Sequence, residues 1–393
     1  MSLVPLTCAP MNYKWGKIGT SSLVYQLLSK SQSNIKFQES EPYSELWMGD
    51  HPSAPSYTQE GQRISDKYGN IHFLAKILSI NTPLSLQCHP NKAQAEQLHS
   101  RNSQFYPDDN DKPEMGIFLT RTILLYGFRQ YSSIVHFLNN ISEFAELCGR
   151  KQVDAFCSNP SSSTLKNLIT ALLHSSKSDI ERLSASFLSR LSTSEYRQSH
   201  ELSENSIYIL DSLTHEAIQH ISNHFPNDIG IFFPLILNVL DGNYGDALYI
   251  PPGTLHAYLK GDLFEIMNVS DNVLRAAMTP KHIDIENLLK VVNFRSFSPL
   301  WVKPTQQGQT SIYCSPDKKF LIHFINPDSN SKIALPSQNR LSILLNLSGQ
   351  TYVNGKVIKQ GSVHLIPKMT SLEISSINEK SVLIYASSPL DES

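Results

Sequence analysis

The residues best suited to chemistry include a histidine that follows a tight turn. His256 lies three residues after Gly253 of the Pro251-Pro252-Gly253 turn, within a stretch of strand-like residues. The two prolines fix φ and the glycine can take a positive φ, so His256 should begin a returning strand with its imidazole facing inward. A single inward histidine is either a packed core residue or a metal ligand, and its neighbours must distinguish the two.

A polar face on a strand earlier in the chain supports the hypothesis that His256 is a metal ligand. In the run Leu84–His89, period two places Ser85, Gln87 and His89 on one face and three apolar side chains on the other. Three polar side chains facing a barrel interior would be costly to bury unless a metal and its bound water satisfied them. The alternative is a solvent-exposed polar face on an edge strand.

A carboxylate completes the set. Lys112-Pro113-Glu114 leads from a polar loop into the apolar run Met115–Leu119, so Glu114 should face inward at the start of a strand, where it needs a partner. We therefore predict a divalent cation site with one amide oxygen, two imidazoles and one carboxylate, from Gln87, His89, Glu114 and His256. This donor set suits zinc in a catalytic site, and two histidines with a carboxylate could equally hold iron(II) for oxygen chemistry.

Charged residues around the predicted strands favour a phosphorylated ligand. A phosphorylated polyol needs several charged partners, whereas an oxygenase pocket needs few. The chain offers six such residues, namely Lys76, Lys112, Glu265, Asp271, Arg275 and Lys281.

Two sequence patterns predict the strands and helices that position these residues. Strand-like runs cover most of the chain, but apolar steps of three and four residues predict helices between about 131 and 225. The expected fold is mainly β with an α-helical insertion. We predict a catalytic domain formed by 1–126 and 227–305, an inserted helical domain over 127–226, and a C-terminal β domain over 306–393.

The amino-acid composition limits the kinds of molecule that this protein is expected to bind. The 393 residues include 33 Lys+Arg and 35 Asp+Glu, a net charge of −2 without basic runs or acidic tails, which favours a small-molecule partner over nucleic acid or a membrane surface. The N-terminus lacks a signal-like pattern, so we expect a cytoplasmic protein, and we expect a monomer. Five cysteines without a Cys-x-x-Cys pair argue against disulfides and a thiolate zinc site.

Longer motifs point to one family. The chain contains NYKWG, ELWMGDHPSAPS, FLAKILSINTPLSLQCHPNKAQAEQLH, DKPEM and HAYLKGDLFEIMNVSDNVLRAAMTPKHID, with helices inserted between the last two. Together these closely resemble the type I phosphomannose isomerases. The resemblance implies a cupin-type jelly-roll barrel, a helical domain and a second, C-terminal jelly-roll-like barrel. It also implies one Zn²⁺ per chain on the four ligands, and Arg275 as a catalytic arginine. The implied reaction interconverts mannose 6-phosphate and fructose 6-phosphate, feeding GDP-mannose synthesis and mannose catabolism.

An aldose–ketose isomerase needs further residues. A carboxylate or lysine with a shifted pKa must move a proton between C2 and C1, and donors must hold the phosphate. The candidates for proton transfer are Glu265, Lys112 and Lys76. The candidates for substrate binding are Ser85, Lys112, Tyr258, Asp271 and Lys281.

Two positions depart from the family pattern. Asp111 stands where histidine is usual, and Ala277 stands where glycine is usual. The first puts a histidine-assisted ring opening in doubt, and the second could shift the loop that carries Arg275. The alternatives to an isomerase are a sugar-phosphate-binding cupin that has lost catalysis through these two substitutions, and an iron-dependent cupin oxygenase.

Overall fold

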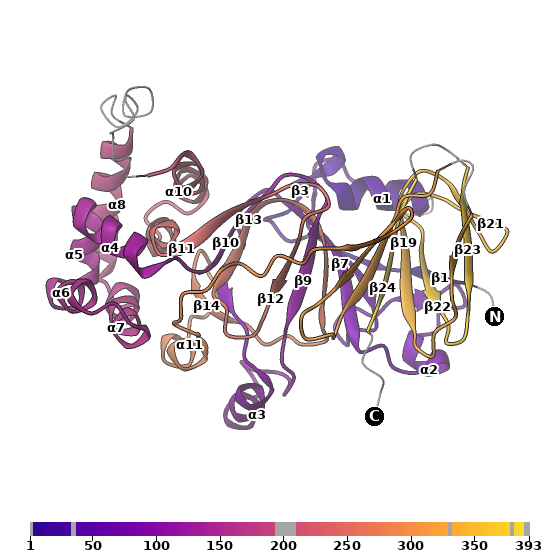
Figure 1. Cartoon of the computed structure of the whole chain (residues 1–393), viewed down its shortest axis with the longest axis horizontal. Helices are drawn as coiled ribbons and strands as arrows, with labels where there is room; N and C mark the ends of the chain where they lie inside the picture. The colour runs from indigo at the N-terminus through magenta and orange to yellow at the C-terminus, as the bar shows by residue number, and fades with distance from the viewer. Residues whose placement is uncertain (1–2, 33–36, 193–209, 329–331, 378–380, 389–393) are drawn as a thin grey trace.

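Three parts lie in a row along the long axis of the molecule. The computed structural model describes residues 3–32, 37–192, 210–328, 332–377 and 381–388. A helical cluster occupies one end, a strand barrel the middle, and the C-terminal sheets the other end (Figure 1). The antiparallel sheets and the inserted helices confirm the predicted fold class. The domain limits given above stay predictions.

The barrel is organised around one long strand. β13 (His256–Asn268) pairs antiparallel with four strands, β7 (Phe73–Ile80), β8 (Leu86–Cys88), β9 (Glu114–Phe118) and β10 (Thr122–Phe128). The sheet continues through β2 (Ala9–Met11), β5 (Glu45–Gly49), β11 (Leu237–Gly242), β12 (Ala247–Ile250) and β14 (Leu274–Ala277).

β13 changes neighbours near its middle. Its first half pairs with β8 and β10, and its second half pairs with β7 and β9. The change occurs around Gly261, whose φ is +128° and where a Cβ would lie 2.3 Å from Thr122 Oγ1. Only glycine fits this close approach, so one strand serves both halves of the barrel and directs His256 and Glu265 into the same interior.

The helices of the insertion pack on the outside of the barrel. Their apolar faces share one core with Leu86 and Cys88 of β8 and with Leu274 and Ala277 of β14, so the helical part supports these two strands from behind. The helices are α4 (Tyr131–Asn140), α5 (Ser142–Cys148), α6 (Arg150–Ser158), α7 (Ser162–Leu173), α8 (Lys177–Leu191) and α10 (Ser212–His224).

The C-terminal part contains strands from both ends of the chain. β1 (Val4–Thr7) pairs with β22 (Val363–Ile366) on one side and with β6 (Tyr57–Thr58) on the other. Its larger sheet also contains β15 (Thr305–Gln307), β16 (Thr310–Cys314), β17 (Leu321–Ile325), β19 (Ser342–Ser348) and β24 (Val382–Ser387). The smaller sheet contains β18 (Ile333–Leu335), β20 (Thr351–Val353), β21 (Lys356–Ile358) and β23 (Leu372–Ser376).

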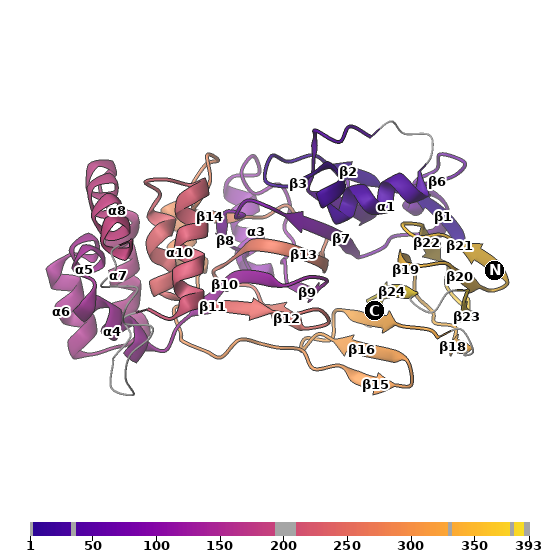
Figure 2. The ribbon, with the colours of Figure 1, turned by 90° about the horizontal axis from the view of Figure 1, so that it is seen from above.

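A shared apolar core joins the barrel to the C-terminal sheets. Val24 and Leu27 of α1 (Leu23–Ser31) belong to one cluster with Phe73 of β7 and Ile322 of β17. Viewed from above, α1 lies along the edge between the two parts (Figure 2). The shorter elements are β3 (Lys17–Ile18), β4 (Pro42–Tyr43), α2 (Ile64–Tyr68), α3 (Lys92–Arg101), α11 (Ile285–Val291) and the 3-10 turns at Gly19–Ser21 and Ile229–Leu235.

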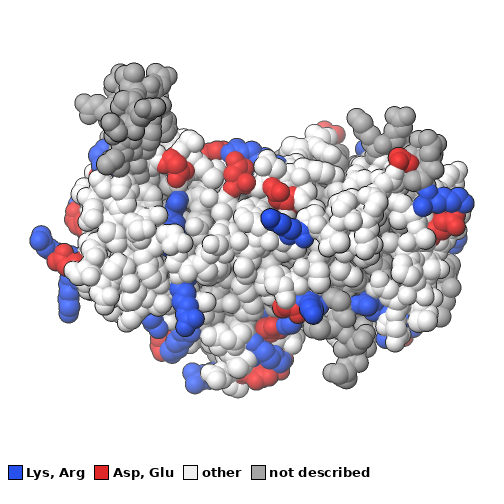
Figure 3. All heavy atoms as spheres, viewed as in Figure 1, with Lys and Arg blue, Asp and Glu red and all other residues white. Residues whose placement is uncertain are grey.

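The surface carries charges of both signs. On the face shown in Figure 3, acidic and basic side chains are interspersed, in keeping with the net charge of −2. Within the described ranges, no helix is long and apolar enough to cross a membrane. The five cysteines carry free thiols.

We predict that Gly361→Ala destabilises the junction of α1 with the C-terminal sheet. A Cβ at Gly361 (φ +81°) would lie 1.9 Å from the carbonyl oxygen of Leu27. Gly355→Ala is the matched control, because its φ is +74° and no heavy atom lies within 4 Å of the added Cβ. The positive φ should cost about 1–2 kcal/mol in both variants, and overpacking should add about 1–3 kcal/mol in Gly361→Ala alone. Urea unfolding midpoints measure the difference, and equal midpoints for the two variants would contradict this packing.

Candidate active site

Three predicted site residues lie in one row across adjacent strands. Gln87 of β8 is directly opposite His256 of β13 on one side and Arg275 of β14 on the other. Residues directly opposite in antiparallel strands project to the same face of a sheet. The three side chains therefore share the inner face, as the alternation of residues 85–89 predicts.

The two histidines and the carboxylate converge in the interior. His89, Glu114 and His256 are 2%, 2% and 1% exposed, and their ligand atoms lie within 4.8 Å of one another. Glu114 Oε1 is 3.2 Å from His89 Nε2, and Glu114 Oε2 is 3.3 Å from His256 Nε2. The structure thus brings together three of the four predicted ligands as a possible cation site.

The orientation of the imidazoles indicates what this site holds. His89 Nδ1 lies 2.8 Å from the carbonyl oxygen of Asn272, and His256 Nδ1 lies 2.9 Å from that of Thr254. Because a carbonyl only accepts, each Nδ1 carries the proton and each Nε2 presents a lone pair. Both Nε2 atoms are buried and have no hydrogen-bond partner among the described residues. Two lone pairs and a carboxylate facing one another repel unless a cation lies between them, so these residues fit a divalent metal ion.

The pKa shifts agree with this arrangement. Burial, followed by the charge of Lys112, lowers the pKa of His89 to about 4, so its imidazole is neutral at pH 7. Burial alone would raise the pKa of Glu114, but the charged surroundings, which include Lys112, outweigh burial and hold that pKa well below its usual range. A neutral imidazole and an ionised carboxylate are the protonation states in which these groups bind a metal.

Gln87 is the fourth predicted ligand. Its Oε1 accepts a hydrogen bond from Ser85 Oγ at 3.2 Å, and its side chain shares the inner face with His256. The amide oxygen is therefore on the correct face, held by the predicted substrate contact Ser85. Its role as a metal ligand stays a prediction.

A second group of charges lies in the same interior. Lys76 of β7 is directly opposite Glu265 of β13, and its Nζ is 3.5 Å from Glu265 Oε2. Lys112 Nζ is 3.6 Å from Glu114 Oε1. Lys76, Lys112 and Glu265 are 6%, 7% and 4% exposed, so the three predicted proton-transfer residues are buried beside the possible metal site.

These buried charges differ in their protonation. Burial, together with repulsion from Glu114, raises the pKa of Glu265 to about 7. Burial lowers the pKa of Lys112, although Glu114 opposes this. Burial would also lower the pKa of Lys76, but the carboxylates of Glu45, Glu265 and Glu114 outweigh it and raise that pKa. Glu265 is therefore the group that can both lose and accept a proton near neutral pH, whereas Lys76 stays a cation.

Tyr258 also faces the interior. Its hydroxyl is buried and has no hydrogen-bond partner within the described part of the chain. Gly116 of β9 makes room for it, since a Cβ there would lie 2.9 Å from the Tyr258 hydroxyl. A buried donor without a partner is available to a bound ligand.

Arg275 and Lys281 occupy more open positions. Arg275 is half-buried, burial lowers the pKa of its guanidinium, and it has no hydrogen bond or ion pair to any described residue. Lys281 is exposed, and its Nζ lies 6.0 Å from the ring centroid of Tyr13. Both cations are therefore available to an anionic substrate.

Sequence reasoning missed several residues that support the site. Trp47 lies opposite Lys76, its ring is 5.0 Å from Lys76 Nζ, and its indole N–H donates to Glu45. His51 is 2% exposed, and its Nε2 is 3.4 Å from Asp271 Oδ1, which fixes the predicted substrate contact Asp271. Glu45, Trp47 and His51 all lie in the ELWMGDHP motif. Because this motif is one of those that resemble the family, it could have indicated that the three residues belong to the site.

Comparisons with known proteins give a consistent result. Residues 3–131 match the catalytic domain of type I phosphomannose isomerase, and residues 136–237 match its helical insertion domain. The Homo sapiens mannose-6-phosphate isomerase is 32% identical over 421 residues, which cover 97% of each chain. The chain belongs to the type I phosphomannose isomerases. The Arabidopsis thaliana mannose-6-phosphate isomerase 1 is 30% identical, over 95% of this chain and 91% of that protein.

Solved structures of this family have the same fold. The apo mannose 6-phosphate isomerase of Salmonella typhimurium aligns over 99% of this chain and 100% of that chain, with a TM-score of 0.80 and 26% identity. A mannose 6-phosphate isomerase with bound zinc and yttrium aligns equally well, with a TM-score of 0.80 and 26% identity. Zinc therefore occurs in a phosphomannose isomerase of this fold.

We predict that His256→Ala removes the metal without unfolding the barrel. The substitution deletes one ligand and leaves a small cavity, while the backbone pairing of β13 is unchanged. Metal affinity, measured by competition with a chelator, should fall by far more than the about 10–100-fold typical of indirect positioning residues. His136→Ala, in the helical insertion, is the control and should keep its metal. Full metal retention in His256→Ala would contradict the ligand assignment.

Proposed function

We propose that this phosphomannose isomerase interconverts mannose 6-phosphate and fructose 6-phosphate with one zinc ion, held by Gln87, His89, Glu114 and His256. The observation that carries the proposal is the convergence of a buried carboxylate and two unpartnered imidazole Nε2 atoms in the barrel interior. This reaction would feed GDP-mannose synthesis and mannose catabolism. Bound zinc would act as a Lewis acid toward the sugar oxygens.

The reaction requires two proton movements within the sugar. In the direction of fructose 6-phosphate, the hydrogen on C2 moves to C1 as a proton, and the hydroxyl proton of O2 moves to O1. We assign the carbon proton to Glu265, which is buried in the interior and has a pKa near 7. Lys76, held protonated and 3.5 Å away, stabilises the ionised form of Glu265.

The remaining residues position the substrate. Arg275 lies in the same row as Gln87 and His256, so its unpartnered guanidinium can approach the oxygens on C1 and C2, where negative charge develops. Lys112, buried beside Glu114, holds this carboxylate in place. For the phosphate we assign Ser85 and the exposed Lys281, with Tyr258 and Asp271 as contacts to the sugar hydroxyls.

The thiols and the surface of the enzyme bear on its cellular compartment and on its oligomeric state. Free cysteines accord with a reducing cytoplasm. Exposed large apolar side chains occur singly, as at Ile18 and Tyr244, or in pairs, as at Tyr352 opposite Val357, and groups this small favour a monomer.

A coupled isomerase assay tests the proposed activity. Mannose 6-phosphate should be converted, whereas unphosphorylated mannose should react with a far lower kcat/KM, because charge-assisted bonds to the phosphate supply binding energy for the transition state. Comparable kcat/KM values for the two sugars would refute the proposed phosphate recognition. Metal-dependent oxygen uptake without isomerisation would instead support the oxygenase alternative.

Arg275→Lys tests the role of the guanidinium. Lysine keeps the charge but loses the planar fork that can contact two sugar oxygens, so kcat should fall by about 10²–10³-fold, with a smaller change in KM. Metal content should remain that of the wild type, because the Arg275 guanidinium makes no hydrogen bond or ion pair with any of the four predicted ligands, although its backbone is paired with Gln87. If kcat is unchanged and only KM rises, Arg275 binds the phosphate and does not stabilise the transition state.

A further inference from the structure

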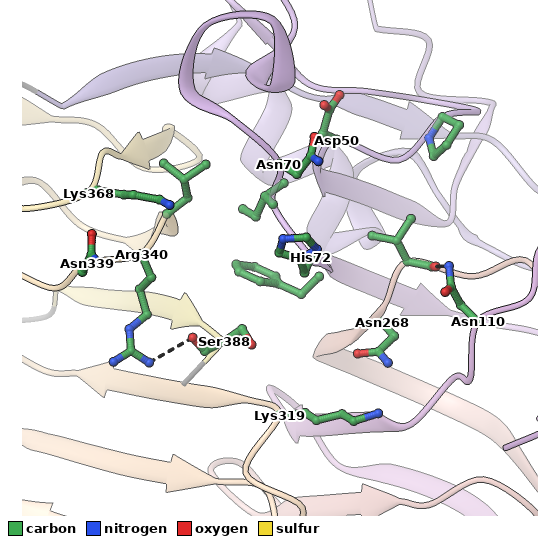
Figure 4. Close-up of a pocket in the computed structure, with 15 residues that line it drawn as sticks. Asp50, Asn70, His72, Asn110, Asn268, Lys319, Asn339, Arg340, Lys368 and Ser388 are labelled. Carbon is green, nitrogen blue, oxygen red and sulfur yellow. Dashed lines mark hydrogen bonds between the residues drawn. The ribbon is translucent and has the colours of Figure 1, made fainter. Parts of the chain in front are cut away.

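A cleft of about 720 Å³ lies between the barrel and the C-terminal sheets, apart from the residues assigned to the active site. Its barrel side is formed by Asn110, by Asn268 at the end of β13 and by His72 just before β7. Its C-terminal side includes Arg340 and Lys368 (Figure 4). This volume is typical of pockets that bind small molecules.

The formal charges that line the cleft are mainly positive. Lys319, Arg340 and Lys368 are cationic, and Asp50 is the acidic residue of the lining. The charge of Asp50 is already neutralised, because Arg63 Nε and Nη2 each donate to its Oδ1 at 3.0 Å. Lys319 is likewise paired with Asp111, so the attraction of this lining for an anion depends on Arg340.

Arg340 is the residue most clearly left without a counter-ion. Its Nη1 donates to the carbonyl oxygen of Ser388 at 2.9 Å, a bond that fixes the side chain but does not neutralise it (Figure 4). Its Nε is buried and has no hydrogen-bond partner in the described ranges, and no described carboxylate pairs with it. A fixed guanidinium with an unused donor is well suited to the oxygens of a phosphate.

Carboxamides supply the second part of the chemistry. Asn70 and Asn339 are exposed at the cleft and make no side-chain hydrogen bond to a described residue. Asn268 uses its Nδ2 to donate to Asp111 Oδ1 at 2.8 Å, which leaves its Oδ1 as an acceptor toward the cleft. Amides that can donate and accept are suited to hydroxyl groups, which do both.

We propose that this cleft is a second ligand site, for a hydroxylated organic phosphate whose phosphate binds Arg340 and whose hydroxyls bind the carboxamides. Lys319 lies at the same cleft but is already paired with Asp111 at 2.5 Å, so we assign it no contact to the ligand. The site is separate from the proposed isomerase centre, since its lining contains none of the residues assigned to metal or sugar.

Isothermal titration calorimetry on the metal-loaded enzyme tests the proposal, with ribose 5-phosphate and inorganic phosphate as probes. Each titration is repeated on His256→Ala, in which the isomerase centre is disabled while the residues that line the cleft are unchanged. Ribose 5-phosphate should bind both proteins with the same dissociation constant, and at least tenfold more tightly than inorganic phosphate. Loss of binding in His256→Ala would assign the probe to the isomerase centre and overturn the proposal, and equal binding of the two probes would overturn the role of the hydroxyls.

Arg340→Gln provides the site-specific variant. It removes a charge-assisted contact, so the dissociation constant for ribose 5-phosphate should rise by about 10- to 100-fold. Arg295→Gln removes an equal charge from an exposed position outside the cleft and should leave the dissociation constant unchanged. Circular dichroism, metal content and kcat should match the wild type in both variants. Unchanged binding in Arg340→Gln, or no binding of either probe to the wild type, would overturn the proposal.

Discussion

The burial of one carboxylate between two imidazoles is the constraint on which the rest of the site depends. Glu114 is 2% exposed, and its oxygens face two lone pairs. An ion this deep costs several kcal/mol in lost hydration unless opposite charge and hydrogen bonds offset the loss. A divalent cation would supply that charge, and Lys112 adds to it from 3.6 Å. The same cation would account for the lack of protein partners at both Nε2 atoms.

The scaffold must hold these opposed charges without collapsing onto them. Both imidazoles are anchored through Nδ1 to backbone carbonyls, so their orientation depends on the course of the chain and not on mobile side chains. β13 directs His256, Tyr258 and Glu265 into the interior, because its register against β10 shifts between Tyr258 and Lys260 and so brings odd-numbered positions to the inner face. The helical core supports β8 from behind. Apolar packing outside the barrel thus fixes the polar geometry inside it.

The sequence predicts features that depend on local patterns. Gln87 and His89 could be placed inward because a strand alternates every second residue, and Glu114 because a polar loop runs straight into an apolar strand. Contacts between segments that are far apart in the sequence leave no such local pattern. His51 meets Asp271 across 220 positions of sequence, and β1 pairs with β22 near the opposite end of the chain. Such pairings depend on the folded arrangement of whole sheets, so the spacing of neighbouring residues does not predict them.

The two departures from the family pattern lie where they do not disturb the site. The Asp111 carboxylate accepts hydrogen bonds from Asn268 and Lys319, so it joins the loop before Glu114 to the end of β13 and to the C-terminal part. Asp111 thus connects three parts of the structure, and the effect of the missing histidine on ring opening stays a prediction.

Ala277 lies opposite Leu86, after a register shift that follows Arg275, and its methyl group is buried in the core shared with the helices. The irregular register takes up the change in chain direction at that point, and Arg275 remains opposite Gln87. Since the buried metal residues and Arg275 keep their common face in spite of both substitutions, the structure gives no support to a cupin that has lost catalysis at these positions.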